Sequence, residues 1–317
     1  MGVNNAKNIP NFRQKVKIFR ATSSFCSYIK PMLSYQHAFH AGNQADVLKH
    51  SVWAQVLSAL LTKPKPLIVM ETHAGRGVYP VAAAETARHT EYQHGLAMVP
   101  WMQAANPYLH VVKNMNEDGV LRTIPGSPAV AQALLRETPD VADHLHLCEA
   151  HPTEFDYLEN WRRGLTTHWK NVHIHHANGH SHGPALVKAG QRVAVMIDPS
   201  YEVKTEYEQT VATVAEIVKR NPHAVVVVWF PVLAQGGGKG LHQTLIDGLK
   251  ALDCQASHLT QWQWAPREGG GMYGSGQVVL NLPYGTEKVL EKTVTDLASA
   301  LKIPRRTTTC TWLVPRR

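Results

Sequence analysis

The sequence has few cysteines and no long apolar run, and both shortages exclude classes of protein. Its four cysteines are far apart and none forms a CxxC pair. This spacing fits neither a disulfide scaffold nor a zinc ribbon and favours a reducing compartment. The longest apolar run, residues 224–230, has the length of a strand, whereas a bilayer span needs ~20 residues. We therefore expect a soluble, cytoplasmic protein without a membrane partner.

Acidic residues are missing from the first 31 positions, which carry six of the 32 lysines and arginines. The other 26 basic residues nearly balance the 24 acidic ones, so most of the formal charge of +8 belongs to this short leader. The leader lacks the apolar stretch of a secretory signal. We expect residues 1–31 to be a disordered or appended leader, because the patterned sequence begins at Met32.

Beyond the leader, helical and strand-like patterns alternate, which predicts an α/β fold. Apolar residues at three-to-four spacing predict an amphipathic helix over 45–62. From residue 144 onward, strands alternate with helices, which indicates a mostly parallel, Rossmann-like sheet of about seven strands with helices on both faces. Two late strands, SHLTQWQW and GQVVLNLP, suggest an antiparallel pair at the edge. This order is typical of the class I methyltransferase fold.

One segment interrupts the alternation. Residues 80–128 combine alanine-rich helical text with four prolines, and we interpret them as an inserted, mostly helical subdomain. Residues 32–79 then form an N-terminal motif with the first half of the main domain, and residues 129–317 form the remainder.

The strongest short motif is Asp198-Pro199-Ser200-Tyr201, directly after the apolar strand VAVMI. Ligands of open α/β sheets bind at the carboxyl ends of the strands. The motif resembles the (D/N)PP(Y/F) sequence of methyltransferases acting on the amino group of adenine or cytosine. The Asp198 carboxylate and the Pro199 carbonyl could accept the two N–H bonds of that amine, and Asp198 could take its proton. Tyr201 would stack on a flipped base. A plain turn is the alternative, because Asp-Pro is common in turns.

A glycine-rich turn, HAGRG, follows the first predicted strand and is the candidate cofactor loop. Gly75 and Gly77 would let the backbone approach a ligand closely. Glu149 ends the next strand, at the position where an acid binds the hydroxyls of a cofactor ribose. Asn178 and Gly179 follow the third strand and would lie near the adenine of the cofactor. Each of these residues could equally be an ordinary turn or surface residue.

Histidines are concentrated in one stretch, HIHHANGHSHG, which raises the question of a metal site. His173, His175 and His176 belong to a predicted strand whose successive side chains point to opposite faces, so all three cannot converge on one ion. No cysteine or HExxH pattern supports metal binding. GGGKG (236–240) lacks the frame of a phosphate-binding loop. We expect no metal cofactor.

Together these segments resemble the RlmJ-type 23S ribosomal RNA N6-adenine methyltransferases. The resemblance runs from Met32 to Pro315 and rests on MLSYQHAFHAGNQADVLKH, ETHAGRGVY, IPGSP, CEAHP, ANG, IDPSYE, WFPV and TWLVP. It implies S-adenosylmethionine as methyl donor, no metal, and N6-methylation of an adenine in 23S rRNA. The implied cofactor contacts are His50, His73, Gly75, Gly77, Ser127, Glu149, Asn178, Gly179 and Asp198. Asp198 is also the implied catalytic acceptor, and the candidate substrate contacts are Tyr35, His37, Lys49, Pro199 and Tyr201.

Two residues depart from the pattern of that family. Asn178 replaces its usual aspartate, which we expect to change cofactor affinity more than chemistry. Ser200 replaces a proline, which we expect to make the turn less stiff.

The sequence leaves two other functions open. The DPSY motif does not distinguish RNA from DNA, so DNA adenine methylation is possible, and the resembled family has also been linked with the use of external DNA. A catalytically inactive nucleic-acid-binding homologue is the other alternative, with Ser200 as its main support. The expected partner is 23S rRNA, free or in an early assembly intermediate, with no obligate protein partner.

Overall fold

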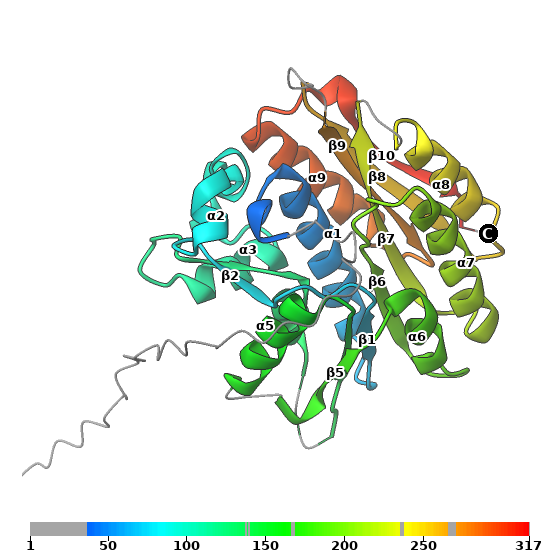
Figure 1. Cartoon of the computed structure of the whole chain (residues 1–317). Coiled ribbons are helices and arrows are strands. Elements are labelled where there is room, and N and C mark those ends of the chain that lie inside the picture. The colour runs from blue at the N-terminus through cyan, green and yellow to red at the C-terminus, as the bar shows by residue number, and fades with distance from the viewer. Residues whose placement is uncertain are drawn as a thin grey trace, which may run out of the picture. The chain divides into compact units, whose positions relative to one another are not determined.

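The computed structural model describes residues 37–136, 138, 140–165, 169–234, 238–265 and 271–316 (Figure 1). The predicted leader at residues 1–31, the candidate substrate contact Tyr35 and the first two residues of GGGKG lie outside these ranges. Residues 34–317 group into one compact unit. The described helices and strands all belong to this unit.

A mostly parallel sheet forms the centre, and its strands run in the spatial order β10-β8-β9-β7-β6-β1-β4-β5. Its parallel strands are β1 (Ile68–Glu71), β4 (His144–Glu149), β5 (Val172–His176), β6 (Val193–Ile197) and β7 (Val225–Leu233). Antiparallel pairs connect β7, β9 (Met272–Leu280), β8 (Ser257–Gln263) and β10 (Thr308–Val314). The strand order reverses between β1 and β6, so this is the predicted class I α/β arrangement with its switch point beside β1.

The sheet has one strand more than predicted, and that strand changes where the edge lies. The antiparallel pairing of β8 with β9 is confirmed. Its predicted place at the edge is wrong, because β10 pairs with β8 from outside. The β10 segment, TTCTWLV, is rich in β-branched residues, which favour a strand. The residue pattern of this seven-residue segment does not indicate which strand it pairs with.

Two groups of helices cover the two faces of the sheet. One face carries α1 (Gln44–Leu61), α4 (Ser127–Leu134), α5 (Pro152–Arg163) and α9 (Glu287–Ala300), which share one apolar cluster. The other carries α6 (Gly179–Leu186), α7 (Thr205–Arg220) and α8 (Leu241–Lys250) over a second cluster. Alternate valines of β7 enter the two clusters, as expected for a strand buried on both faces. None of these helices, nor any other that the structure describes, combines the length and apolar character of a membrane span.

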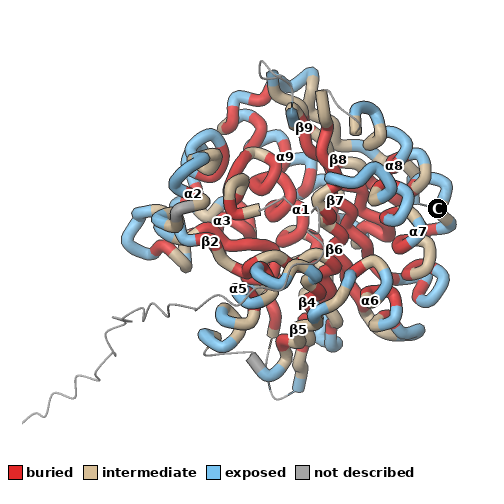
Figure 2. Tube along the Cα trace, viewed as in Figure 1, coloured by how far each residue is buried: buried red, intermediate tan, exposed pale blue. Residues whose placement is uncertain are grey.

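Helix α1 differs from its prediction in a way that matters for the site. The predicted helix over 45–62 is confirmed, but its polar side is not exposed to solvent, since the buried residues of its first turns include Asp46, Lys49 and His50. Figure 2 shows most of α1 as buried. It packs between the sheet and the helices α3 (Pro107–Met115), α4 and α9. The residue pattern locates the apolar side of such a helix, but it cannot show that other elements also cover the polar side.

The predicted insertion, residues 80–128, holds α2 (Ala84–His89), α3 and three short 3₁₀ turns, Glu91–His94, Leu96–Met98 and Trp101–Gln103. Two strands that the sequence does not predict, β2 (Val78–Pro80) and β3 (Thr123–Pro125), pair antiparallel at its base. Each has only three residues and one of them is proline, which is too short to show an alternating pattern. Through α3 the insertion packs on α1.

Carboxyl ends of the parallel strands meet at one edge of the sheet. Glu71 ends β1, Glu149 ends β4, Asn178 follows β5 and Asp198 follows β6. The topology therefore brings the candidates Glu149, Asn178 and Asp198 to the edge where ligands of open α/β sheets bind, together with Glu71, which the sequence analysis does not single out.

Candidate active site

Asp198 is held by a lysine from a distant part of the chain. Lys49, on α1, donates from Nζ to Asp198 Oδ2 at 2.7 Å, and the same nitrogen lies 2.9 Å from Asp46 Oδ1, one helical turn away. The Lys49 and Asp46 side chains are each only 3% exposed. Burying an ammonium group costs free energy unless the group is paired. Here two carboxylates, Asp46 and Asp198, pair with the Lys49 ammonium.

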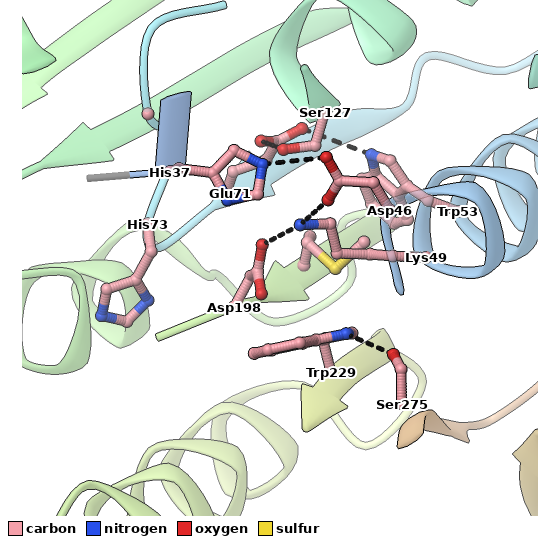
Figure 3. Close-up of polar contacts among 12 residues, drawn as sticks. His37, Asp46, Lys49, Trp53, Glu71, His73, Ser127, Asp198, Trp229 and Ser275 are labelled. Carbon is pink, nitrogen blue, oxygen red and sulfur yellow. Dashed lines mark hydrogen bonds and ion pairs between the residues drawn. The ribbon is translucent and has the colours of Figure 1, made fainter. Parts of the chain in front are cut away.

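The network continues to His37, whose Nε2 lies 3.0 Å from Asp46 Oδ2 (Figure 3). The backbone N–H of Gly42 donates to the same oxygen at 2.9 Å. His37, Asp46, Lys49 and Asp198 therefore form one connected chain of polar contacts. Three of these residues come from the N-terminal motif, and two of them, His37 and Lys49, are predicted substrate contacts.

Burial and charge compete in this network. Burial raises the pKa of Asp198 above its ordinary value, although the Lys49 ammonium opposes the shift. For Asp46 the balance is reversed, since the neighbouring His37 and Lys49 outweigh burial and hold its pKa well below the usual range. The pKa of Lys49 is raised because its two carboxylates outweigh its burial. Asp198 is thus the more basic of the two carboxylates, as a proton acceptor requires.

Trp229, which the sequence analysis does not single out, lies beside this network. The Lys49 Nζ is 5.5 Å from the centroid of its ring, within the range of cation–π attraction. Its indole N–H donates to Ser275 Oγ at 2.8 Å (Figure 3), and its backbone carbonyl accepts the Tyr201 hydroxyl at 2.8 Å.

The DPSY turn itself is only partly arranged as the motif suggests. Asp198 reaches the Lys49 network and Pro199 is buried next to it. Tyr201, the predicted stacking residue, is 5% exposed, and its ring packs beside Tyr207 at a centroid distance of 4.4 Å. Its backbone has a φ of 54°, a left-handed conformation that is uncommon outside glycine. Such an outlier after a strand marks a turn that the surrounding structure holds in place.

Glu149 secures the glycine-rich turn. Its two carboxylate oxygens accept the backbone N–H groups of Gly75, at 2.8 Å, and His151, at 2.7 Å. Gly75 has a φ of 66°, which favours glycine. Burial raises the pKa of Glu149. A carboxylate has about four acceptor positions, so these two bonds leave capacity for the hydroxyl groups of a ligand.

Asn178 and Gly179 begin helix α6, and the two have different surroundings. Asn178 is exposed and caps the helix, its Oδ1 accepting the His180 N–H at 2.9 Å. Gly179 is buried, and a Cβ there would lie 1.9 Å from the carbonyl oxygen of Thr72. Glycine is therefore needed for α6 to pack on the segment that follows β1, which also carries His73.

We expect Gly179→Ala to destabilise the protein by about 1–3 kcal/mol, because the added methyl group must displace the Thr72 backbone. Asn178→Ala is the matched control, since it removes the cap of the same helix without a clash and should cost about 1 kcal/mol. Urea unfolding of the two variants measures the difference. Equal stability of Gly179→Ala and wild type would show that α6 moves freely away from β1.

Three further predicted cofactor contacts line the same region. Burial lowers the pKa values of His50 and His73 to about 3, so both rings are neutral near pH 7. The Nδ1 atom of His73 lies 2.8 Å from the hydroxyl oxygen of Thr72. His50 is 1% exposed, and its Nδ1 has no hydrogen-bond partner among the residues that the structure describes. A polar ligand could satisfy this nitrogen. Ser127 donates from Oγ to Glu71 Oε2 at 2.6 Å.

Glu71 is a second residue that the sequence analysis misses. It is fully buried at the end of β1, where Ser127 and the Trp53 indole N–H donate to its two oxygens. Burial raises its pKa to about 8, against the effect of these two hydrogen bonds. Its only signal in the sequence is an acid that closes an apolar strand directly before the glycine-rich turn.

Replacing Glu71 by glutamine is expected to flatten the pH dependence of stability. The native carboxyl keeps its proton up to about pH 8, whereas the unfolded chain releases it near the ordinary pKa of 4.5. The native state therefore binds more protons in this window, and wild-type stability falls as pH rises, by at most ~1.4 kcal/mol per pH unit. Urea unfolding of both proteins at about pH 5.5 and about pH 8 tests this. An equal fall in both would contradict it.

The histidine-rich region is paired rather than convergent on one point. His173 and His175 of β5 share a face, and their rings stack on those of His144 and His146 of β4, respectively. In each pair, Nε2 of the β5 histidine lies 3.2 Å from Nδ1 of the β4 histidine. Within the described ranges, no group of three or more histidine, cysteine or acidic side chains could hold a metal ion.

Comparisons with known proteins place the chain in a family. The family model described as "Ribosomal RNA large subunit methyltransferase D, RlmJ" matches residues 64–314. The chain is 36% identical over 294 residues to Ribosomal RNA large subunit methyltransferase J of Escherichia coli (strain K12), a match that covers 90% of this chain and 100% of that protein. The protein of the same name from Haemophilus influenzae is 33% identical over the same length and with the same coverage.

A solved structure shares the fold as well. The crystal structure of protein LPL1258 from Legionella pneumophila is 29% identical and superposes with a TM-score of 0.73, over 86% of this chain and 97% of that one. The family match covers most of the present chain, including all the strands of the sheet. This protein therefore belongs to the RlmJ family of ribosomal RNA large subunit methyltransferases.

Proposed function

We propose that this protein transfers a methyl group from S-adenosylmethionine to N6 of an adenine in 23S ribosomal RNA. The observation that carries the proposal is the Asp198 carboxylate, held by the buried Lys49 at the carboxyl edge of the sheet. Two relatives at 36% and 33% identity are named as ribosomal RNA methyltransferases, which supports the substrate class. The proposal includes a cytoplasmic location for the reaction, as for the ribosomal RNA that is its substrate.

The residues at the edge of the sheet fit such a cofactor. In the proposal, Glu149 accepts the ribose hydroxyls and Asn178 lies near the adenine, while His50, His73 and Ser127 border the remainder. The buried Nδ1 of His50, which lacks a hydrogen-bond partner in the described part of the chain, supports this assignment, because a polar ligand group would satisfy it. When bound, the cofactor supplies an electrophilic methyl carbon attached to a positively charged sulfur.

Asp198 addresses the chemical difficulty of the reaction. The lone pair of an adenine amine is delocalised into the ring, so the nitrogen is a weak nucleophile. Lys49 bonds Asp198 through Oδ2, and in the proposal Oδ1 accepts one N–H of the amine while the Pro199 carbonyl accepts the other. This arrangement favours a tetrahedral nitrogen, and the carboxylate takes the proton that leaves as the new C–N bond forms.

Lys49, Asp46 and His37 act on the substrate through Asp198. The Lys49 ammonium fixes the orientation of the carboxylate and keeps it ionised in a buried site. Asp46 balances the charge of Lys49, and its contact with His37 ties the 3₁₀ turn His37–Phe39 to the site. These residues are positioning residues, whereas Asp198 is the catalytic residue.

Methyl transfer to three candidate substrates tests the proposal. Radiolabelled S-adenosylmethionine is incubated with the full chain and protein-free, unmodified 23S RNA, assembled large ribosomal subunits or duplex DNA of the same sequence. We expect label in the protein-free RNA and little in the assembled subunit or the DNA. Label in DNA alone would replace the proposal by DNA methylation. A bound cofactor without any transfer would favour an inactive homologue.

A further inference from the structure

Trp229 lies beside Asp198 because of the register of two parallel strands. Ile197 of β6 pairs with Val228 of β7, so the residues that follow, Asp198 and Trp229, are neighbours across adjacent strands. Parallel strands lie about 4.8 Å apart, and paired residues point to the same face of the sheet. Figure 3 shows the indole below the Asp198 carboxylate, with its nitrogen directed toward Ser275.

The orientation of the indole is fixed from three directions. Ser275 accepts its N–H at 2.8 Å, and the Tyr201 hydroxyl donates to the Trp229 carbonyl at 2.8 Å. The Lys49 ammonium, which bonds Asp198, lies 5.5 Å from the ring centroid. The Lys49 ammonium therefore contacts both the Asp198 carboxylate and the face of the Trp229 ring. A buried indole N–H usually has a hydrogen-bond partner, and here the bond to Ser275 also sets the orientation of the ring beside Asp198.

A base that is taken out of its stack is held by an aromatic or apolar surface next to the reacting group. The DPSY motif assigns this surface to Tyr201, whose ring packs beside Tyr207 at a centroid distance of 4.4 Å. Tyr201 and Trp229 are both buried, at 5% and 7% exposed, so burial does not decide between them and the contact with Lys49 does. Among the aromatic rings that the structure describes, Trp229 is the one in cation–π range of the lysine bound to Asp198.

We propose that Trp229 is the residue whose ring contacts the target adenine, and that Tyr201 and Ser275 position that ring. The inference rests on the proposed function and extends it by naming the aromatic contact of the substrate base. It gives Tyr201 a different role from the one that the motif suggests, because the tyrosine acts through the Trp229 backbone and does not touch the base.

Kinetic constants for protein-free 23S RNA separate this role from simple packing. We expect Trp229→Leu to lower kcat/KM by about 10- to 100-fold, the effect of losing one base-stacking contact, while the Kd of S-adenosylhomocysteine stays within about twofold. Trp229→Phe keeps a stacking surface and should lose less than about fivefold. Trp312→Leu, on the edge strand β10, is the matched control and should keep the wild-type kcat/KM.

Fluorescence provides a readout that does not depend on turnover. Adding 23S RNA to the complex with S-adenosylhomocysteine should quench tryptophan emission in wild type and in Trp312→Phe, and this quenching should be lost in Trp229→Phe. Equal quenching in all three proteins, or an equal kcat/KM for Trp229→Leu and Trp312→Leu, would overturn the inference. Wild type that is quenched through Trp229 but transfers no methyl group would instead overturn the proposed function alone.

Discussion

Replacing Asp198 by asparagine is expected to lower kcat for methyl transfer to 23S RNA by about 10³-fold. The amide can still accept a hydrogen bond from the adenine amine, but it cannot take the proton that the nitrogen loses. It also leaves Lys49 with Asp46 as its one remaining carboxylate partner in the described structure. Initial rates at saturating RNA and cofactor measure the effect directly.

A matched control shows that the effect belongs to this carboxylate. Asp118 is an exposed acid between α3 and β3 that pairs with Arg122, and Asp118→Asn should keep the wild-type rate. Calorimetric binding of S-adenosylhomocysteine to Asp198→Asn shows whether the cofactor site is intact. If Asp198→Asn bound the cofactor and kept more than about a tenth of the wild-type kcat, Asp198 would not be the proton acceptor.

Lys49→Met should affect stability and activity together. The variant leaves Asp46 and Asp198 buried without their shared cation, and breaking a buried ion pair costs about 3–5 kcal/mol. Without the ammonium, repulsion between the carboxylates and burial both favour a protonated Asp198, which cannot accept the proton from the amine. We expect the free energy of unfolding to fall by this amount and kcat to fall by about 10²-fold.

A double variant distinguishes the two effects. Lys49→Met combined with Asp46→Asn removes one of the uncompensated charges, so part of the lost stability should return while kcat stays low. Lys292→Met, at an exposed lysine paired with Asp296, is the control for loss of a surface charge and should change neither quantity. Recovery of activity along with stability in the double variant would show that Lys49 supports only the fold.

Much of the site could be predicted because its signals are local. An acid directly after a buried apolar strand, followed by proline, indicates a ligand-facing turn wherever the strand lies in a parallel sheet. The same reasoning locates the turn before Gly77 and the acid at Glu149. The apolar run VAVMI before Asp198 is the strand β6, Val193–Ile197, in the structure.

The partners of these residues could not be predicted, because they depend on tertiary packing. Lys49 and Asp198 are 149 positions apart in the sequence, and no local pattern relates them. Helix α1 shows an apolar stripe, but its buried polar residues are recognisable only when α3, α4, α9 and the sheet are in place. The sequence analysis does not single out Glu71 and Trp229 for the same reason. Each lies in a strand of apolar residues, and its contacts come from other parts of the chain.

The Tyr201 prediction shows what a motif leaves unspecified. The sequence places an aromatic residue three positions after the aspartate, but it does not specify the backbone conformation there. The structure gives Tyr201 a positive φ and bonds its hydroxyl to the Trp229 carbonyl. In this arrangement the tyrosine ring is packed inside the protein, and stacking on a base through Tyr201 stays a prediction.

Identification of the methylated nucleoside is the most direct test of adenine methylation at Asp198. Protein-free 23S RNA is treated with wild type and with Asp198→Asn, digested to nucleosides and analysed by mass spectrometry. We expect N6-methyladenosine at about one per RNA molecule with wild type, and none above background with the variant. A methyl group on a ribose, on a cytosine or on another position of adenine would contradict amine activation by this carboxylate.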